Sequence, residues 1–353
     1  MPVKSRNSIY RPNRKDEHIL LALRQKPGLA DFSDIHLINN CLPERDLNEV
    51  TLETTLMGTP LRSPLFINAV TGGTPLAMRV NQALAAVAAR CDLPMALGSQ
   101  MAALENPALE ATYRVVRRTN PRGVIWANLG SYASPEMVRR AVEMVGASAV
   151  QIHLNVPQEL AMREGDCRFR GILSRIKEIC QASPVPVIVK EVGFGIAREQ
   201  ALQLMEAGVA AIDVGGKGGT NFLAIENRRS GNRISRELLE WGLPTAITLL
   251  EVLSAVKGKV DVIAAGGVTS SLNIAKSLAL GAKAVGLAGL PVYLLMKYGR
   301  ERLVREIKKI EKELRLIMLM SGAANLAELR QVPLVITGAT AEWLRQRNIP
   351  FRP

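Results

Sequence analysis

The chain has 353 residues, of which 48% are hydrophobic and 4% aromatic, and its formal net charge is +13. This length permits two average domains or one large α/β barrel, and we expect one domain over residues 1–353. The low aromatic content and the acids interleaved with the bases exclude a typical base-stacking nucleic-acid binder. The sequence shows no signal-peptide core and no apolar run of about 18 residues, so we expect a cytoplasmic protein without a membrane partner.

Eight short apolar runs recur along the chain, most of them followed by a helical stretch. They are continuous rather than alternating, which is typical of parallel strands buried on both faces. The runs cover residues 64–70, 94–99, 123–130, 148–155, 185–193, 210–216, 260–267 and 283–289. Amphipathic segments between them predict helices over residues 77–91, 135–146, 198–208 and 270–282. The pattern predicts a (β/α)8 TIM barrel, with a doubly wound sheet as the alternative.

Two further segments flank the predicted barrel: an N-terminal extension over residues 1–60 and a C-terminal tail over residues 318–353. Basic residues gather in the extension without apolar periodicity, so we expect them to meet an anionic ligand; they are Lys4, Arg6, Arg11, Arg14 and Lys15. A second basic cluster, residues 297–318, has apolar residues at helical spacing and interleaved acids. It predicts a solvated helix face with ion pairs one turn apart.

Small polar groups end the first three runs, at the side of the barrel where active sites lie. They are AVTGG (69–73), GSQ (98–100) and Asn128. Their hydroxyl and amide groups suit hydrogen bonding to a polar heterocycle.

The fourth run ends in HLNVPQE (153–159). His153 and Asn155 are two residues apart and so share one face of the strand end. Pro157 should end the strand, and we expect Gln158 and Glu159 to begin a loop. Beside a diphosphate, Glu159 is a candidate Mg²⁺ ligand, because Mg²⁺ takes one or two carboxylates together with phosphate oxygens.

The fifth run carries Lys190 inside an apolar strand, where an unpaired ammonium would be costly. Its partner is expected to be a ligand anion or a nearby carboxylate, and a Schiff-base role is the alternative. The side chain of Glu191 is a poor partner, because neighbours on a strand point to opposite faces.

Glycines dominate the ends of the last three runs. VGGKGGTNF (214–222) suggests backbone lying against a flat ligand, and we expect the polar segment 225–235 to be a mobile loop over the site. AAGGV (264–268) and LAGLP (287–291) precede helices at the usual phosphate site of these barrels. Together they predict a bound phosphate.

These motifs, with NRKDEHI (13–19), INAVTGG (67–73), GSQ, QIHLNVPQE (151–159) and GKGGTNF (216–222), resemble the type 2 isopentenyl-diphosphate Δ-isomerases in order over roughly residues 10–340. The resemblance implies an FMN-binding TIM barrel that interconverts isopentenyl and dimethylallyl diphosphate with reduced FMN and Mg²⁺. It also implies NADPH as the reductant of the flavin and a homo-oligomer, either a tetramer or an octamer.

The resemblance also implies roles for individual residues. FMN would be held by Ala69, Val70, Thr71, Gly72, Ser99, Asn128, Lys190, Thr220, Gly266, Gly267, Val268, Ala288 and Gly289. The substrate would be met by Arg14, Lys15, His18, Ser99, Gln100, Met101, His153, Asn155 and Gln158, and the magnesium by Glu159. His153, Asn155 and Gln158 form the implied catalytic set.

Met101 follows GSQ where many members have arginine, so either another base such as Arg228 or Arg229 replaces that charge or diphosphate affinity is lower. The end of the seventh run reads Ala265-Gly266-Gly267 where the family usually has SGG, which costs at most one hydroxyl. The strand ends carry no cysteine and no paired carboxylates that could move both protons. The reduced flavin is therefore the leading acid–base group, with Gln158 positioning the alkene or relaying a proton. Another FMN-dependent barrel oxidoreductase is the alternative function.

Overall fold

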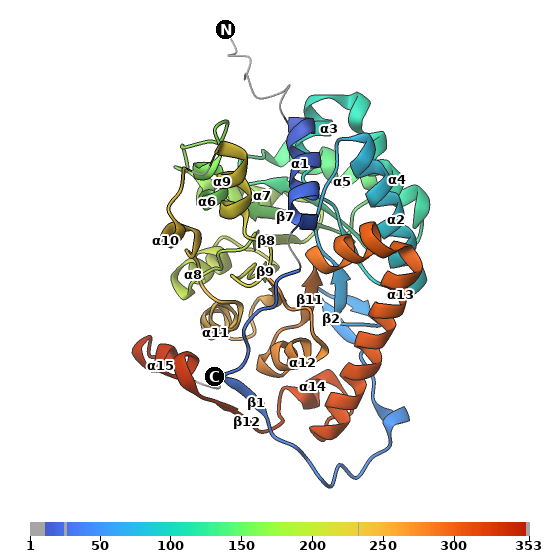
Figure 1. Cartoon of the computed structure of the whole chain (residues 1–353), viewed down its shortest axis with the longest axis vertical. Helices are drawn as coiled ribbons and strands as arrows, with labels where there is room; N and C mark the ends of the chain where they lie inside the picture. The colour runs from blue at the N-terminus through green and yellow to red at the C-terminus, as the bar shows by residue number, and fades with distance from the viewer. Residues whose placement is uncertain (1–10, 25–26, 232, 351–353) are drawn as a thin grey trace.

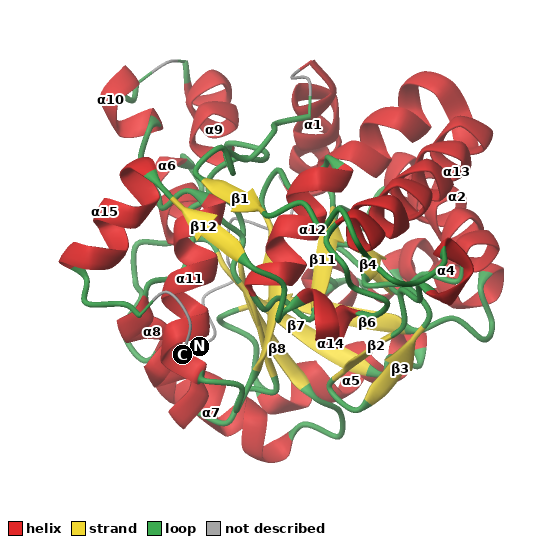
Figure 2. Ribbon diagram, turned by 90° about the horizontal axis from the view of Figure 1, so that it is seen from below, coloured by secondary structure: helices red, strands yellow, loops and turns green. Residues whose placement is uncertain are grey.

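A computed structural model of the chain describes residues 11–24, 27–231 and 233–350, without the side chains of residues 11–14 and 24. Eight parallel strands form a closed barrel, in which each strand pairs with its neighbours along the chain and β11 pairs with β4 (Figure 2). The strands are β4 (Leu65–Ile67), β5 (Met95–Ala96), β6 (Ile125–Gly130), β7 (Ala149–Leu154), β8 (Val187–Glu191), β9 (Ala211–Asp213), β10 (Asp261–Ala265) and β11 (Ala284–Leu287). The predicted (β/α)8 barrel is confirmed, and each strand lies within its apolar run.

Helices surround the strands, as their amphipathic sequences predict. Their bounds are α2 (Pro75–Cys91), α3 (Met101–Glu105), α4 (Ala111–Thr119), α5 (Pro135–Val145), α6 (Val156–Ala161), α7 (Ile172–Ala182), α8 (Arg198–Glu206), α9 (Phe222–Ser230), α10 (Arg236–Leu239), α11 (Thr245–Val256), α12 (Ser271–Leu280) and α13 (Gly289–Met320), with short 3₁₀ turns at Leu47–Glu49 and Pro107–Leu109. Local signals set these bounds. In α2, Thr74 caps the first turn by accepting from the Ala77 N–H, and Pro75 occupies the first helical position.

The barrel interior is packed below the strand ends. The rings of Phe66 and Trp126 lie 4.7 Å apart, and smaller residues such as Ala149 and Ala211 fill the space around them. Leu56 and Leu61, from the hairpin of β2 (Thr54–Leu56) and β3 (Thr59–Leu61), join this cluster. The packed layer leaves any open space at the carboxyl end of the strands.

The extension and the tail meet outside the barrel. β1 (Ile35–Leu37) pairs antiparallel with β12 (Leu334–Ile336), next to α14 (Leu326–Leu329) and α15 (Gly338–Gln346). Figure 1 shows this small sheet at one end of the molecule and α1 (Arg11–Arg24) toward the other, where α1 packs against α2, α9 and α13. The extension therefore reaches the barrel rim through α1.

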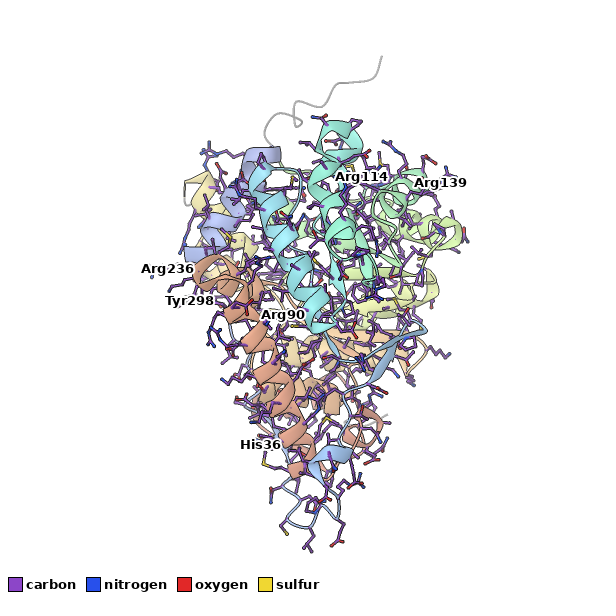
Figure 3. All side chains as sticks on the ribbon, turned by 90° about the vertical axis from the view of Figure 1, so that its right-hand side faces the viewer. His36, Arg90, Arg114, Arg139, Arg236 and Tyr298 are labelled. Atoms are coloured by element: carbon purple, nitrogen blue, oxygen red, sulfur yellow. The ribbon has the colours of Figure 1, made fainter. Side chains whose placement is uncertain are left out.

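The second basic cluster lies on α13, as predicted. Leu303, Ile307, Ile310 and Leu314 are buried, whereas Arg302 pairs with Glu306 and Lys309 with Glu313. Other bases on the outer helices also have acidic partners: Arg90, Arg114 and Arg139, labelled in Figure 3, pair with Glu301, Glu110 and Glu136. Among the described residues, no helix is both long and apolar enough to cross a membrane.

Two expected loops are helical in part: residues 225–230 of the expected loop 225–235, and Gln158 and Glu159, so both expectations are wrong for these residues. Residues 222–230 form α9, because Asn221 caps its start, Gly231 ends it at φ 86°, and Leu223 and Ile225 bury one side of it. Gln158 and Glu159 lie in the first turn of α6, which accommodates Pro157 near its start. Local capping and burial outweigh the polar composition in both segments.

Candidate active site

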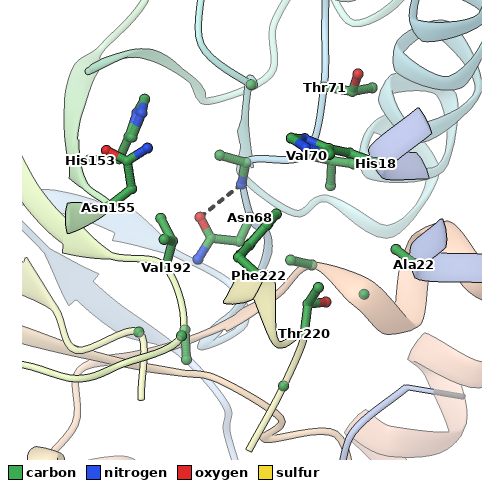
Figure 4. A pocket seen from close by; sticks show the side chains of 18 of the residues that line it. His18, Ala22, Asn68, Val70, Thr71, His153, Asn155, Val192, Thr220 and Phe222 are labelled. Carbon is green, nitrogen blue, oxygen red and sulfur yellow. Dashed lines mark hydrogen bonds between the residues drawn. The ribbon is translucent and has the colours of Figure 1, made fainter. Parts of the chain in front are cut away.

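One pocket, a cavity of about 390 Å³, lies at the carboxyl ends of the strands. Residues from the ends of the barrel strands or the loops that follow them line it, and α1 adds residues from above. Figure 4 shows polar side chains from distant parts of the chain facing this space, among them His18, Thr71, His153 and Thr220. The barrel has thus gathered groups that are far apart in the sequence.

Most of the residues predicted for the site line this pocket. They are Lys15, His18, Ala69, Val70, Thr71, Ser99, Met101, Asn128, His153, Asn155, Gln158, Glu159, Lys190, Thr220, Gly266, Gly267, Val268, Ala288 and Gly289. The side chain of Arg14 lies outside the described part of the structure, as do Lys4, Arg6 and the side chain of Arg11.

Two predicted residues are not on the pocket wall. Gln100 is fully buried: its amide donates to the Ala141 carbonyl at 2.9 Å, and its side-chain oxygen accepts from the Asn128 N–H at 3.0 Å. Gly72 packs against the ring of Tyr113, which leaves no room for a Cβ. Gln100 therefore supports the backbone of β6 in this structure and does not face a ligand.

Lys15 connects α1 to the loop after β5 and to α4. Its ammonium donates to the Ser99 carbonyl at 2.8 Å and to the Tyr113 hydroxyl at 2.7 Å. Asp16 accepts from the Thr74 hydroxyl at 2.5 Å. These contacts hold the predicted anion-binding residues of the extension over the pocket.

A second group of contacts joins α1 to α9. His18 Nε2 lies 2.6 Å from an oxygen of Glu226, which is buried and also accepts from the Gln158 amide at 3.3 Å. Burial acts to raise the pKa of Glu226, but the hydrogen bond with His18 and the charge of Arg229 outweigh it and lower the pKa. Arg229 also pairs with Glu17 on α1. Glu226 thus remains a carboxylate between two predicted substrate-binding residues.

Asn155 and Glu159 are paired at the start of α6. The Asn155 amide donates to one Glu159 oxygen at 2.9 Å, and the Asp166 N–H donates to the other at 3.0 Å. Within residues 11–350 as far as they are described, no cluster of three or more His, Cys, Asp or Glu could hold a metal ion. A cation at Glu159 would therefore need oxygens from a ligand or from water.

Lys190 is buried at the end of β8, and its ammonium donates to the Glu191 carbonyl at 2.7 Å. The nearby carboxylate is Asp213: burial raises its pKa, and the charge of Lys190 opposes that rise. The Glu191 side chain instead accepts the N–H groups of Val192, Gly193 and Phe194. The expectation that Lys190 and the Glu191 side chain do not form a direct pair holds in this geometry.

The pocket suits a flavin mononucleotide in two respects. Thr71 Oγ1 is buried without a hydrogen-bond partner in the described structure, so it is available to a ligand polar group. Gly266 and Gly267 adopt φ angles of 103° and 78°, and α13 begins at Gly289, so a Gly-rich turn and a helix N-terminus converge where a phosphate is predicted.

Sequence reasoning missed several lining residues. Three of them lie within the motifs described above: Asn68, Glu191 and Phe222. Tyr132 and Tyr293 lie in stretches without any motif that indicates a binding site. Glu226 was inside the expected mobile loop. Its burial follows from the packing of α9 against α1 and α6, which no local pattern reveals.

Comparison with known proteins places this site in a family. The family model described as "FMN-dependent dehydrogenase" matches residues 169–335. An isopentenyl-diphosphate delta-isomerase of Symbiobacterium thermophilum is 46% identical over 349 residues, which cover 96% of each chain. The chain belongs to the isopentenyl-diphosphate delta-isomerase family.

Other isopentenyl-diphosphate delta-isomerases agree with this assignment. That of Moorella thermoacetica is 44% identical and covers 98% of this chain and 99% of its own. That of a Geobacillus species is 47% identical and covers 96% of this chain and 97% of its own. Similarity over nearly the whole chain includes the extension, the barrel and the tail.

Solved structures share the fold at lower identity. A mandelate oxidase with a monooxide FMN adduct superposes with a TM-score of 0.63 at 21% identity, covering 91% of this chain and 92% of its own. A second mandelate oxidase has a TM-score of 0.64 at 20% identity, covering 94% of this chain and 99% of its own. At this identity the likeness concerns the barrel fold and not the reaction.

Proposed function

We propose that this chain interconverts isopentenyl diphosphate and dimethylallyl diphosphate, using FMN. The observation that carries the proposal is full-length identity of 46% to a named isomerase, together with a polar pocket formed at the barrel rim. The reaction adds a proton at one carbon of an allylic system and removes one from another. The chain must therefore bind a diphosphate, keep water out and hold two proton-handling positions near the alkene.

FMN would be held by residues of the barrel rim. Thr71, Asn128, Lys190 and Thr220 offer hydrogen bonds or charge to the ring, and Gly266, Gly267 and Gly289 leave room for its phosphate. When bound in reduced form, the cofactor would supply acid–base chemistry to the alkene. Lys190 is a buried cation at this site and would favour an anionic ring.

The substrate would lie between α1 and the end of β7. Lys15, His18, His153 and Asn155 would meet its diphosphate, together with Arg14. Gln158, which Glu226 holds by a hydrogen bond, would orient the alkene or pass a proton. Glu159 would complete a Mg²⁺ site with the phosphate oxygens.

An FMN-dependent oxidoreductase is the second candidate, because the mandelate oxidases share the fold. Such an oxidase should carry a catalytic histidine late in the barrel. All three histidines of this chain, His18, His36 and His153, precede residue 154. The isomerase reading is therefore better supported.

The deciding experiment is anaerobic incubation of the protein with isopentenyl diphosphate, FMN, Mg²⁺ and NADPH. Formation of dimethylallyl diphosphate without net consumption of NADPH is expected. Oxidation of NADPH or of a 2-hydroxy acid without isomerisation would favour the oxidoreductase. Sedimentation of the FMN-loaded protein would test the expected tetramer or octamer.

A further inference from the structure

A row of hydrogen-bonded polar side chains crosses the barrel at the floor of the pocket, from Asp213 on β9 to His153 on β7. The Asn68 amide donates to Asp213 at 2.7 Å, the Gln151 amide to the Asn68 oxygen at 3.0 Å, and the Asn128 amide to the Gln151 oxygen at 3.0 Å. The side-chain oxygen of Asn128 lies 3.0 Å from His153 Nδ1. The other four members of the row, Asp213, Asn68, Gln151 and Asn128, are at most 3% exposed, so bulk water does not compete for these bonds.

Backbone N–H groups fix the direction of this row at its Asp213 end. The Gly215 N–H donates to one Asp213 oxygen at 3.1 Å, and the Ala69 N–H donates to the Asn68 side-chain oxygen at 2.8 Å. A backbone N–H can only donate, so the atom of Asn68 that faces Ala69 must be the oxygen. The Asn68 nitrogen then points to Asp213 and donates to an oxygen of its carboxyl group.

The same rule fixes the orientation of the next two amide groups, those of Gln151 and Asn128. Gln151 must donate to the Asn68 oxygen, so its own oxygen faces Asn128 and accepts. Asn128 donates with its nitrogen, and its oxygen is left for His153 Nδ1. We infer that the buried row from Asp213 through Asn68, Gln151 and Asn128 holds His153 as the tautomer with hydrogen on Nδ1 and none on Nε2. Gln151 and Asp213 are thereby positioning residues that act through another side chain.

This tautomer decides what His153 offers to a ligand. A neutral ring with hydrogen on Nδ1 accepts at Nε2, whereas a protonated ring donates there without breaking its bond to Asn128. A diphosphate oxygen can therefore be bound by a protonated His153 whose ring does not turn. This consequence rests on the proposed function, but the tautomer itself does not.

The tautomer can be read directly in the FMN-loaded protein labelled with ¹⁵N-histidine. At a pH about two units above the ordinary histidine pKa of about 6.5, ¹⁵N NMR distinguishes protonated from unprotonated ring nitrogens. The chain has three histidines, so His18→Gln and His36→Gln spectra assign the His153 signals by difference. We expect hydrogen on Nδ1, and hydrogen on Nε2 in the unsubstituted protein would overturn the inference without any need for a variant in the row.

Two variants of Gln151 test whether the row sets the tautomer. Gln151→Leu removes both hydrogen bonds and frees the Asn128 amide to turn, so a mixture of tautomers is expected. Gln151→Glu should restore the single tautomer, because a carboxyl buried at this position stays protonated, donates to Asn68 and accepts from Asn128. A Gln151→Leu protein that keeps hydrogen only on Nδ1 would refute the inference.

Kinetics and a control separate this role from general stabilisation. We expect Gln151→Leu to lower kcat/KM about tenfold, mainly through KM for the diphosphate, and Gln151→Glu to recover most of that loss.

Asn120→Ala removes a buried amide before β6, outside the row, and should leave the His153 spectrum unchanged. Loss of the tautomer in that control would also overturn the inference. An unsubstituted protein that lacks isomerase activity but shows hydrogen on Nδ1 would count against the proposed function alone.

Discussion

His18 in α1 and Glu226 in α9 are 208 residues apart in the chain, and His18 Nε2 lies 2.6 Å from the Glu226 carboxylate. The same carboxylate oxygen accepts from Gln158 at 3.3 Å. The extension that would bind the diphosphate is thus connected, through one buried acid, to the side chain that would face the alkene. Closure of α1 and placement of Gln158 should therefore respond together to changes at Glu226.

Replacing Glu226 should loosen α1 and weaken substrate binding. We expect Glu226→Ala to raise KM for isopentenyl diphosphate about tenfold, equivalent to about 1.4 kcal/mol. Amide hydrogen exchange across residues 11–24 should also become faster. Glu301→Ala is the matched control, because it removes an exposed partner of Arg90 and should change neither measurement. Unchanged exchange in α1 would show that the contact does not hold the helix.

Gln158 should matter for the reaction and not for the cofactor. We expect Gln158→Ala to lower kcat by about 100-fold or more, because proton transfer and alkene orientation would both suffer. Flavin affinity, measured by fluorescence titration of FMN, should stay within about twofold. A large loss of FMN binding would mean that Gln158 faces the flavin and has been assigned the wrong role.

Glu159 should set the metal requirement. In Glu159→Gln one anionic oxygen is lost, so the Mg²⁺ concentration for half-maximal activity should rise about tenfold or more. The measurement is activity against free Mg²⁺ at saturating substrate. Glu178→Gln removes an exposed carboxylate on α7 and serves as the control. Equal Mg²⁺ dependence in the two variants would contradict the metal role.

Thr71 offers a direct test of the flavin site. Thr71→Val keeps the shape of the side chain but removes the buried, unpartnered hydroxyl, and should weaken FMN binding about tenfold. Ser63 has a second buried hydroxyl without a partner in the described structure, but it does not line the pocket. Ser63→Ala should therefore leave FMN affinity unchanged. Equal effects in both variants would point to a general loss of stability.

Glu191 should make stability depend on pH. Burial raises the pKa of this carboxyl to about 7 from 4.5, although three backbone N–H groups oppose the rise. The protonated Glu191 carboxyl stabilises the folded protein, and this stabilisation is fully present below about pH 4.5. It is lost as the pH rises through 7, because Glu191 loses its proton at a lower pH in the unfolded chain than in the folded protein.

Glu191→Gln removes that titration. The unfolding free energy of Glu191→Gln minus that of the unsubstituted protein should therefore rise by about 3 kcal/mol from pH 4.5 to pH 8. Chemical denaturation of both proteins at the two pH values measures the difference. A constant difference would show that Glu191 does not titrate in this range.

Local patterns were enough to predict the barrel. Continuous apolar runs such as residues 185–193 mark strands buried on both faces, and amphipathic segments such as residues 77–91 mark the covering helices. Polar groups at the strand ends also predicted where the pocket lies, because parallel strands in a closed barrel end at one rim. Lys15, His153 and Lys190 were found in this way or through the family motifs, and all three line the pocket.

The direction of single side chains did not follow from such patterns. Gln100 stands in a site motif, yet it turns into the protein because the Ala141 carbonyl and the Asn128 N–H satisfy its amide there. Residues 225–235 were expected to form a loop from their composition, yet Asn221, Gly231 and the burial of Leu223 make residues 222–230 a helix.

Residue type and periodicity therefore determined the barrel strands, the amphipathic covering helices and the position of the rim, since those depend on burial and backbone preference near each residue. The pairing of His18 with Glu226 and the row from Asp213 to His153 were decided only by the tertiary structure. Hydrogen bonds need partners within about 3 Å and in one orientation. Partners more than 200 residues apart reach that distance only after the barrel closes and α1 packs over it.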